Sequence, residues 1–264
     1  MFQYNVRSMH AARIAELLRP FLTARTGADI QSSPESAPGT IDAGQAATPS
    51  TSQLEYISIY IDILLRWNAR VNLTAVRQAE EILTRHFGES LFAARQLFPV
   101  PPSYSPLAKP AGADAAVRRV EQGAATSNTR VIDVGSGAGF PGLPIKIWAP
   151  QVHLTLIESN HKKATFLKEV ARALTLANVD VVTARAENFS GQAKVVVLRA
   201  VERFGNVLPV AIRFVTPGGR IALLVGDRQL QTAHQLAAAF RWSDPMRIPL
   251  SKGRVLIIGS KEPV

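Results

Sequence analysis

A short apolar strand followed at once by a glycine-rich turn is the feature that most constrains the fold. Residues 131–134 read Val-Ile-Asp-Val, and Gly135, Gly137 and Gly139 follow at alternate positions. Glycines let a backbone turn sharply and approach a ligand closely, and the amides of the turn and the next helix can face polar or anionic ligand groups. The pattern therefore predicts a cofactor-binding turn between a strand and a helix.

Short β-branched runs separated by helical patterns continue from this turn along the chain. Strands are predicted at residues 131–134, 153–157, 179–182, 195–198 and 221–225, and helices at residues 143–148, 161–174 and 204–215. This alternation predicts an α/β fold of the Rossmann-like type, with a mostly parallel, doubly wound sheet. Two closing runs, at residues 246–250 and 254–258, are separated only by Ser251, Lys252 and Gly253. This spacing predicts a hairpin that adds an antiparallel strand at the edge of the sheet.

The part of the chain before the sheet contains helical and low-complexity segments. Apolar residues recur at helical spacing within residues 10–22, 54–67 and 81–98. Residues 23–52 are rich in Ser, Pro, Gly, Ala and Thr, and residues 99–128 combine Pro-Pro-Ser with an Ala/Gly-rich run. We expect an N-terminal helical region at 1–98 with a flexible insertion at 23–52, a low-complexity linker at 99–128 and a Rossmann-like domain at 129–264.

The glycines fit two cofactor-binding patterns. With Asp133 at the strand end, Gly135-x-Gly137-x-Gly139 is typical of S-adenosylmethionine-dependent methyltransferases, whereas Gly137-x-Gly139-x-x-Gly142 satisfies the dinucleotide pattern of nicotinamide-dependent oxidoreductases. An oxidoreductase also needs an acid or base beside its substrate, and the later strand ends show no His candidate. We favour the methyltransferase and keep the oxidoreductase as the alternative.

Other residues at the ligand edge of the predicted sheet complete the expected cofactor site. Glu158 ends the second strand about twenty residues after the glycine turn, where a carboxylate can accept hydrogen bonds from both ribose hydroxyls. Ala186 and Glu187 follow the third strand and are expected to contact the adenine, and Phe140 is expected to cover the cofactor. The full set is Asp133, Gly135, Gly137, Phe140, Glu158, Ala186, Glu187 and Arg199.

The composition excludes several kinds of chemistry. The chain has no cysteine, which excludes disulfides, thiolate metal sites and the cysteine nucleophile that methylation of pyrimidine carbon five requires. His86 and His161 have no partner at metal-ligand spacing, so we expect no metal and interpret both as core or surface residues. The end of the fourth strand, residues 197–200, reads Val-Leu-Arg-Ala and lacks the Asn/Asp-Pro-Pro-aromatic turn of exocyclic-amine methyltransferases.

A ring nitrogen such as guanine N7 is the acceptor that these exclusions favour. Its lone pair carries no proton, so attack on a sulfonium methyl requires alignment more than proton removal. We expect Arg199 to be the catalytic residue, because its fork of donors can position the cofactor, a phosphate or the Hoogsteen edge of guanine. The alternative for Arg199 is an ion pair with an acid such as Glu187.

The charge balance indicates a polyanionic partner. Lys and Arg total 30 against 20 Asp and Glu, which gives a formal net charge of +10. Basic residues crowd the helix after Glu158 and recur along the ligand edge, including Lys162, Lys163 and Arg185. The sequence has no run of about eighteen apolar residues and no apolar signal core, so we expect a cytoplasmic protein without membrane attachment. We also expect a monomer.

Several motifs together resemble one known family. The motifs are residues 65–68 (Leu-Arg-Trp-Asn), 71–77 (Val-Asn-Leu-Thr-Ala-Val-Arg), 85–90 (Arg-His-Phe-Gly-Glu-Ser) and 133–144, the extended glycine turn. They are similar to signatures of the bacterial small-subunit ribosomal RNA guanine-N7 methyltransferases, the glucose-inhibited division protein B family. The resemblance implies S-adenosylmethionine-dependent methylation of guanine N7 in small-subunit (16S) ribosomal RNA, with the small ribosomal subunit or its RNA as partner.

The resemblance also implies roles for individual residues. It implies cofactor contacts at Gly135, Phe140, Ala186, Glu187 and Arg199, with Glu158 in place of the usual Asp, and RNA contacts at Lys162, Lys163 and Arg185. The chain departs from the family at Val225, where a lysine often stands, and in its two low-complexity stretches. These departures keep a third hypothesis open, a non-catalytic RNA-binding protein with a methyltransferase fold.

Overall fold

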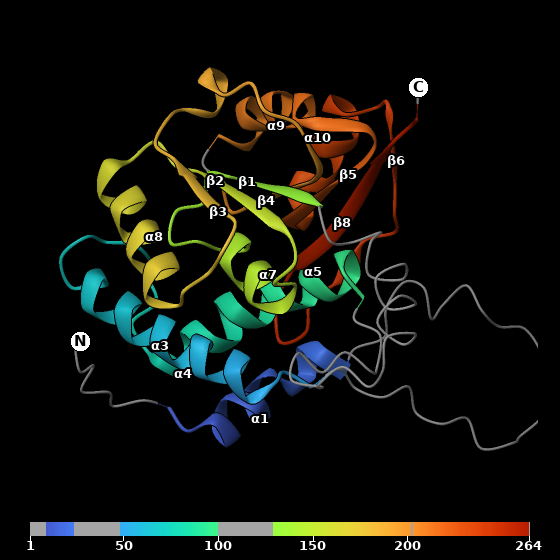
Figure 1. Cartoon of the computed structure of the whole chain (residues 1–264). Helices are drawn as coiled ribbons and strands as arrows, with labels where there is room; N and C mark the ends of the chain where they lie inside the picture. Colours follow the sequence, from blue (N-terminus) through green and yellow to red (C-terminus); the bar gives the residue numbers. More distant parts are fainter. Residues whose placement is uncertain (1–8, 24–47, 100–128, 202, 264) are drawn as a thin grey trace, which may run out of the picture.

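A sheet with helices on both faces forms the centre of the molecule (Figure 1). The computed structural model describes residues 9–23, 48–99, 129–201 and 203–263. The order across the sheet is β3-β2-β1-β4-β5-β8-β6, and β7 pairs with β8. The strands are β1 (Arg130–Val134), β2 (His153–Ile157), β3 (Val179–Val182), β4 (Ala193–Arg199), β5 (Val215–Gly226), β6 (Phe240–Trp242), β7 (Met246–Arg247) and β8 (Arg254–Lys261).

The pairing of the strands confirms a mostly parallel, doubly wound sheet. Strands β3, β2, β1, β4 and β5 pair in parallel, and β8 runs antiparallel to β5. The predicted hairpin is present, with Met246 of β7 opposite Leu256 of β8. One strand was not predicted: β6 pairs with β8 on its outer side, so β8 lies inside the sheet edge. A strand of three residues is too short to produce a clear periodicity.

Buried strand residues alternate between two hydrophobic cores, one on each face of the sheet. In β4, Val195 and Val197 belong to the core that α7 (Gly142–Trp148) and α8 (His161–Ala173) cover. Val196 and Leu198 belong to the opposite core, which α9 (Phe204–Arg213) and α10 (Asp227–Leu236) cover. Burial on both faces explains why the central strands are almost continuously apolar in sequence.

The N-terminal helices form an additional layer on the α7 and α8 side (Figure 1). Their apolar residues belong to the same continuous core as those of α7 and α8. Residues 24–47 of the expected insertion and 100–128 of the expected linker lie outside the described residues. The elements are α1 (Ala11–Thr23), α3 (Thr51–Asn68), α4 (Ala79–Ile82), the π-helical segment η1 (Leu83–Gly88) and α5 (Glu89–Leu97).

Helix α3 begins before its predicted start at residue 54 because of a capping box. Ser50 Oγ accepts the backbone N–H of Gln53, and Gln53 Oε1 accepts the backbone N–H of Ser50 at 2.8 Å. The Gln53 Nε2 amine also donates to the carbonyl oxygens of Ile147 and Trp148, at 2.8 and 3.3 Å. The same side chain therefore starts α3 and attaches it to the end of α7.

Gly88 allows α1 to approach the helices that carry part of the candidate site. A Cβ at Gly88 would lie 2.6 Å from Phe21 Cδ2, and Phe21 is 1% exposed, so its ring has no free space. We expect Gly88→Ala to lower the free energy of unfolding by about 1–3 kcal/mol through overpacking. Gly205 in α9 is the matched control, because its added Cβ meets no atom within 4 Å. Urea unfolding of both variants measures the difference, and equal effects would contradict the overpacking.

Candidate active site

A cavity of about 630 Å³ lies at the carboxyl ends of β1, β2, β3 and β4. The strand order reverses between β1 and β4, which is where open α/β sheets bind ligands. The volume suits a small-molecule site. Its lining includes seven of the eight residues expected to bind the cofactor, namely Gly135, Gly137, Phe140, Glu158, Ala186, Glu187 and Arg199.

The glycine turn forms one wall of this cavity. Gly135, Gly137 and Gly139 have φ values of +71°, +56° and +86°, which side chains with a Cβ rarely adopt. The backbone N–H groups of Gly135 and Ser136 both donate to Ile157 O, at 2.9 and 3.0 Å. These bonds hold the turn against the end of β2.

Asp133 does not line the cavity, although the sequence placed it in the cofactor site. It is 1% exposed, and its Oδ2 accepts the backbone N–H of Gly142 at 2.9 Å. Its Oδ1 is buried without a hydrogen-bond partner among the described residues, and burial raises the pKa of the carboxyl to about 7. A Cβ at Gly142 would lie 2.6 Å from Asp133 Oδ2. Gly142 thus faces an internal carboxyl group and lets the start of α7 pack closely against β1.

Both carboxylate oxygens of Glu158 accept hydrogen bonds from the backbone. Oε2 accepts from Gly137 N at 2.8 Å, and Oε1 accepts from Asn160 N at 2.7 Å. Glu158 is 7% exposed and lines the cavity. An ionised carboxylate has about four acceptor positions, so each oxygen keeps capacity for a ligand hydroxyl. The exposed Glu187 and its neighbour Ala186 lie on η2 (Ala186–Asn188), on the β3 side of the same cavity.

Arg199 ends β4 and is joined to a buried carboxylate from the N-terminal helices. Its Nε and Nη2 donate to Glu89 Oε2 at 3.1 and 2.9 Å. Arg254 Nη1 of β8 donates to the same oxygen at 2.8 Å. The ion-pair partner of Arg199 is therefore Glu89 and not Glu187, which the sequence suggested. With Glu89 4% exposed at its side chain, this is a buried charge cluster.

His86 is a part of the site that the sequence did not reveal, because we interpreted it as a core or surface residue. It is 8% exposed and lines the cavity. Arg199 Nη2 donates to Arg85 O at 2.8 Å and lies 2.9 Å from His86 Nδ1, and His86 Nε2 lies 2.8 Å from Thr74 Oγ1. Burial, together with the positive charges of Arg199, Arg85 and Arg254, lowers the pKa of His86 to about 3. The imidazole is neutral at physiological pH.

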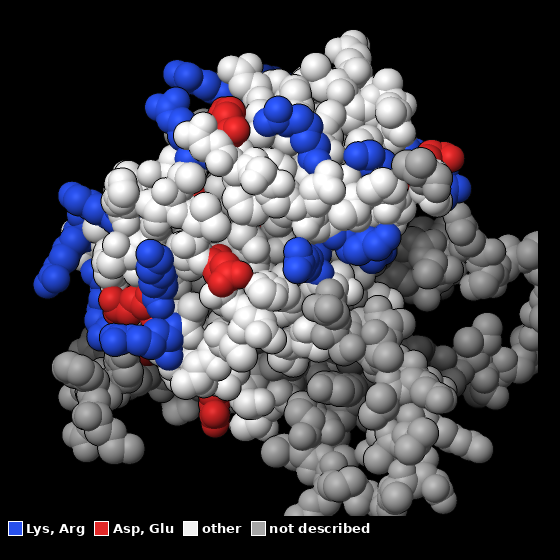
Figure 2. Space-filling model, turned by 45° about the horizontal axis from the view of Figure 1, so that its top comes forward, with Lys and Arg blue, Asp and Glu red and all other residues white. Residues whose placement is uncertain are grey.

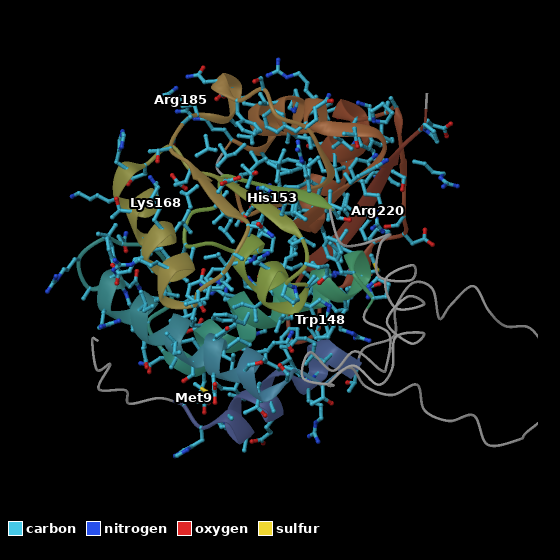
Figure 3. The ribbon with its side chains drawn as sticks, viewed as in Figure 1. Met9, Trp148, His153, Lys168, Arg185 and Arg220 are labelled. Atoms are coloured by element: carbon cyan, nitrogen blue, oxygen red, sulfur yellow. The ribbon has the colours of Figure 1, made fainter. Side chains whose placement is uncertain are left out.

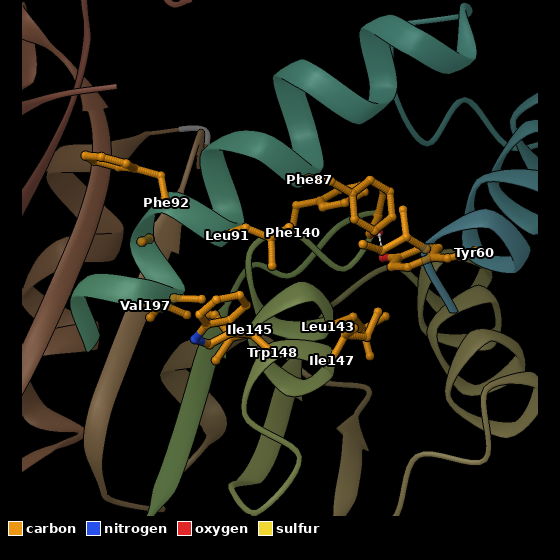
Figure 4. Packing of buried hydrophobic residues seen from close by; sticks show 14 of the residues in the cluster. Tyr60, Phe87, Leu91, Phe92, Phe140, Leu143, Ile145, Ile147, Trp148 and Val197 are labelled. Carbon is orange, nitrogen blue, oxygen red and sulfur yellow. Dashed lines mark hydrogen bonds between the residues drawn. The ribbon is translucent and has the colours of Figure 1, made fainter. Parts of the chain in front are cut away.

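Phe140 lines the cavity but is mostly core. Its ring is 5% exposed and stacks against Tyr60 and His86, at centroid distances of 5.4 and 4.9 Å. Figure 4 shows Tyr60 and Phe87 gathered around Phe140, and the Tyr60 hydroxyl donates to Ala138 O. The sequence suggested that Phe140 covers the cofactor, but little of its ring is free to do so. Its packing instead holds the glycine turn against the helices.

Basic side chains lie at the mouth of the cavity, where exposed residues belong to its lining. Lys163, Arg185 and Arg203 are among its lining residues, whereas Lys162 is exposed on α8 outside the lining. Figure 3 shows Lys168 and Arg185 at the periphery of the molecule, and in Figure 2 Lys and Arg side chains spread over the face that turns toward the viewer. A surface of this kind attracts polyanions.

Two further features concern metals and membranes. Within residues 9–23, 48–99, 129–201 and 203–263, no group of three or more His, Asp or Glu side chains is arranged to hold a metal ion. In the same ranges, no helix has the length and apolar character needed to cross a membrane.

Val225, where the resembled family often has lysine, is 4% exposed and belongs to the core under α9 and α10.

The family model and the similar curated proteins all indicate the same family. A family model described as rRNA small subunit methyltransferase G matches residues 53–98 and 117–252. Ribosomal RNA small subunit methyltransferase G of Roseiflexus castenholzii is 34% identical over 219 residues, which cover 78% of this chain and 82% of the relative. The protein of the same name from Xanthomonas campestris pv. campestris is 33% identical over 208 residues, covering 77% and 84%. The cavity-lining residues all fall within the two matched ranges.

Breaking the buried charge cluster should destabilise the protein strongly. Glu89→Gln keeps the side-chain shape but leaves Arg199 buried beside a neutral amide, and we expect a loss of about 3–5 kcal/mol in the free energy of unfolding. Glu81→Gln is the control, because Glu81 pairs with Arg85 at 3.5 Å while both side chains are 50% exposed, and we expect less than about 1 kcal/mol. Urea unfolding compares them; a loss from Glu89→Gln as small as the control's would refute the cluster's role.

The neutral state of His86 predicts a pH dependence of stability. The pKa of His86 falls from 6.5 to about 3 on folding, so between these pH values His86 is protonated in the unfolded chain and neutral in the folded chain. The contribution of His86 to the free energy of unfolding is therefore fully present above pH 6.5 and is lost as the pH falls toward 3. The stability difference between wild type and His86→Gln should therefore shrink by up to about 1.4 kcal/mol per pH unit in that window. Asp133, whose raised pKa acts in the opposite direction, is present in both proteins. Urea unfolding of both proteins at neutral pH and at about pH 5 tests this, and a constant difference would contradict it.

Proposed function

The chain belongs to the rRNA small subunit methyltransferase G family, and from this membership we propose that it methylates N7 of a guanine in small-subunit (16S) ribosomal RNA. The observation that carries the proposal is the agreement between the family match and the cavity, whose lining residues all lie in the matched ranges. S-adenosyl-L-methionine is the methyl donor of this reaction and supplies a methyl group bound to a positively charged sulfur.

The residues around the cavity fit this cofactor. Glu158 retains acceptor capacity for ribose hydroxyls, and Ala186 and Glu187 are suited to the adenine on the β3 side. The turn at Gly135 and Gly137 brings backbone close to the ligand without side chains. The family match favours a methyltransferase over the oxidoreductase alternative.

The β4 side of the cavity supports an acceptor that needs no deprotonation. His86 Nδ1 already accepts from Arg199, and its low pKa makes it a poor base. Arg199 is a cation and has no acceptor atom. Guanine N7 has a free lone pair, so the chain's own residues need only bind and align the base. We therefore propose that Arg199 acts by positioning, with Nε and Nη2 committed to protein atoms.

The basic residues at the mouth support an RNA substrate. We propose that Lys163 and Arg185, together with Lys162 on the adjoining surface, contact phosphates. Because the proposed substrate is ribosomal, we also propose that the protein acts in the cytoplasm, and as a monomer. Light scattering of the purified protein measures the oligomeric state.

A methylation assay tests the proposed function. Purified protein is incubated with isotopically labelled S-adenosylmethionine and either free 16S RNA or assembled small subunits, and the modified nucleotide is identified and mapped by nuclease digestion and mass spectrometry. The expected product is 7-methylguanosine at one position. Cofactor binding and RNA binding without methyl transfer would instead favour the non-catalytic RNA-binding hypothesis.

Removing the charge of Glu158 should weaken cofactor binding. Glu158→Gln places an amide N–H₂ where Gly137 N or Asn160 N now donates to an oxygen, which disturbs the turn and removes a ribose acceptor. We expect the dissociation constant for S-adenosylmethionine to rise about tenfold or more, equivalent to about 1.4 kcal/mol. Asp180→Asn is the control, because Asp180 is exposed in β3 and pairs with His153. Calorimetric titration measures both, and wild-type affinity of Glu158→Gln would contradict the assignment.

A further inference from the structure

Thr74 presents a hydroxyl at the cavity whose proton has no acceptor among the described residues. Thr74 is half-buried and lines the cavity beside His86. Its Oγ1 accepts the backbone N–H of Val76 at 3.1 Å and lies 2.8 Å from His86 Nε2. The direction of this second hydrogen bond decides what the hydroxyl can offer to a ligand.

Arg199 sets that direction. A guanidinium has donors only, and Nη2 carries two hydrogens. Because Nε already donates to Glu89, these two hydrogens serve Arg85 O and His86 Nδ1, which lies 2.9 Å away and is therefore an acceptor. In a neutral imidazole the proton then resides on Nε2, which must donate to Thr74 Oγ1. Both lone pairs of the hydroxyl oxygen are thereby occupied, by His86 and by Val76. The hydroxyl hydrogen remains as a donor, and none of the residues in the described ranges accepts it.

The main chain of Thr74 is also held in place. Asn68 Oδ1 accepts the Thr74 N–H at 2.9 Å, and Asn68 Nδ2 donates to Thr74 O at 2.9 Å. Asn68 is 4% exposed, at the end of α3. Because backbone and hydroxyl oxygen are both fixed, the free hydrogen has a defined position before any ligand binds, which is how preorganised sites save binding energy.

The position of this donor favours the substrate over the cofactor as its acceptor. Thr74, His86 and Arg199 form a hydrogen-bonded series that ends on β4. The groups suited to ribose and adenine, Glu158 and Ala186, follow β2 and β3 on the other side of β1. The donor therefore belongs to the half of the cavity left for the base.

Guanine offers two neighbouring acceptors on its Hoogsteen edge, N7 and O6. An arginine fork facing that edge would bind both and occupy the lone pair that must attack the methyl group. Here the Nε and Nη2 donors of Arg199 are directed to Glu89, Arg85 O and His86, so only Nη1 remains and the side chain has no paired fork to present to the base. Thr74 supplies a single hydrogen, which can bind O6 and leave N7 free.

Resting on the proposed function, we propose that the Thr74 hydroxyl donates a hydrogen bond to O6 of the target guanine. Arg199 and His86 are positioning residues, which direct this hydroxyl by fixing the proton on His86 Nε2. The same arrangement selects guanine against adenine, because adenine carries a donor amine in the place of O6.

Three variants test the role of the hydroxyl. Thr74→Val removes it at nearly constant shape, and we expect kcat/KM for the RNA to fall about tenfold or more. Thr74→Ser keeps the hydroxyl and should restore most of this activity, and the exposed Thr165→Val on α8 is the matched control. Calorimetric titration should give the wild-type dissociation constant for S-adenosylmethionine in all three. A weakened cofactor affinity in Thr74→Val, or unchanged kcat/KM, would overturn the proposal.

A modified substrate identifies the acceptor atom. RNA with 2-aminopurine at the mapped guanosine retains N7 and lacks O6. We expect the kcat/KM of the wild-type protein to be about tenfold lower on this RNA than on unmodified RNA. The kcat/KM of Thr74→Val should be the same on both RNAs, because the variant and the modified base remove the same hydrogen bond. His86→Gln should likewise discriminate less between the two RNAs, which a purely structural role would not produce. Losses that simply multiply would refute the contact with O6, whereas inactivity of wild type on unmodified RNA would contradict the proposed function itself.

Discussion

Glu89 Oε2 accepts hydrogen bonds from Arg199 of β4 and Arg254 of β8, and the active-site side of the molecule depends on these contacts. Removing charged groups from water costs several kcal/mol per ion, so a buried cluster is stable only when its donors and acceptors are paired. Glu89 is also the first residue of α5. The same carboxylate therefore fixes the N-terminal helices against the ends of two strands and orients the arginine at the cavity.

A second set of contacts joins the helices to the glycine turn. Tyr60 of α3 donates to Ala138 O and stacks on Phe140, and a Cβ at Gly139 would collide with the Tyr60 hydroxyl. A glycine is thus needed at position 139 both for helix packing and for its φ of +86°. A Cβ at Gly137, by contrast, would approach only Gly135 O, at 3.8 Å. Alternate glycines of one motif serve different purposes, one toward the core and one toward the ligand.

The sequence predicted the features that local patterns encode. Alternating β-branched runs and helical segments predicted the parallel sheet, and the glycine spacing predicted the turn at its ligand edge. The partner of Arg199 could not be predicted this way, because Glu89 lies 110 positions away and belongs to a different layer of the fold. His86 looked isolated for the same reason, since its partner Arg199 is 113 positions away. Its place within the Arg-His-Phe-Gly-Glu-Ser motif at residues 85–90 was the one signal available.

The charges of the site are arranged in two zones with different effects on an RNA guanine. At the mouth, Lys163, Arg185 and Arg203 contribute to the net charge of +10 and attract phosphates over a distance set by the ionic strength. Inside, Arg199 is paired with Glu89, which Arg254 shares, and His86 is neutral. A guanine that gains a methyl group at N7 becomes positively charged, so an uncompensated guanidinium beside it would oppose the reaction. Pairing with Glu89 offsets part of this cost, although Arg254 shares the same carboxylate, and it lets Arg199 organise the hydrogen bonds of the site.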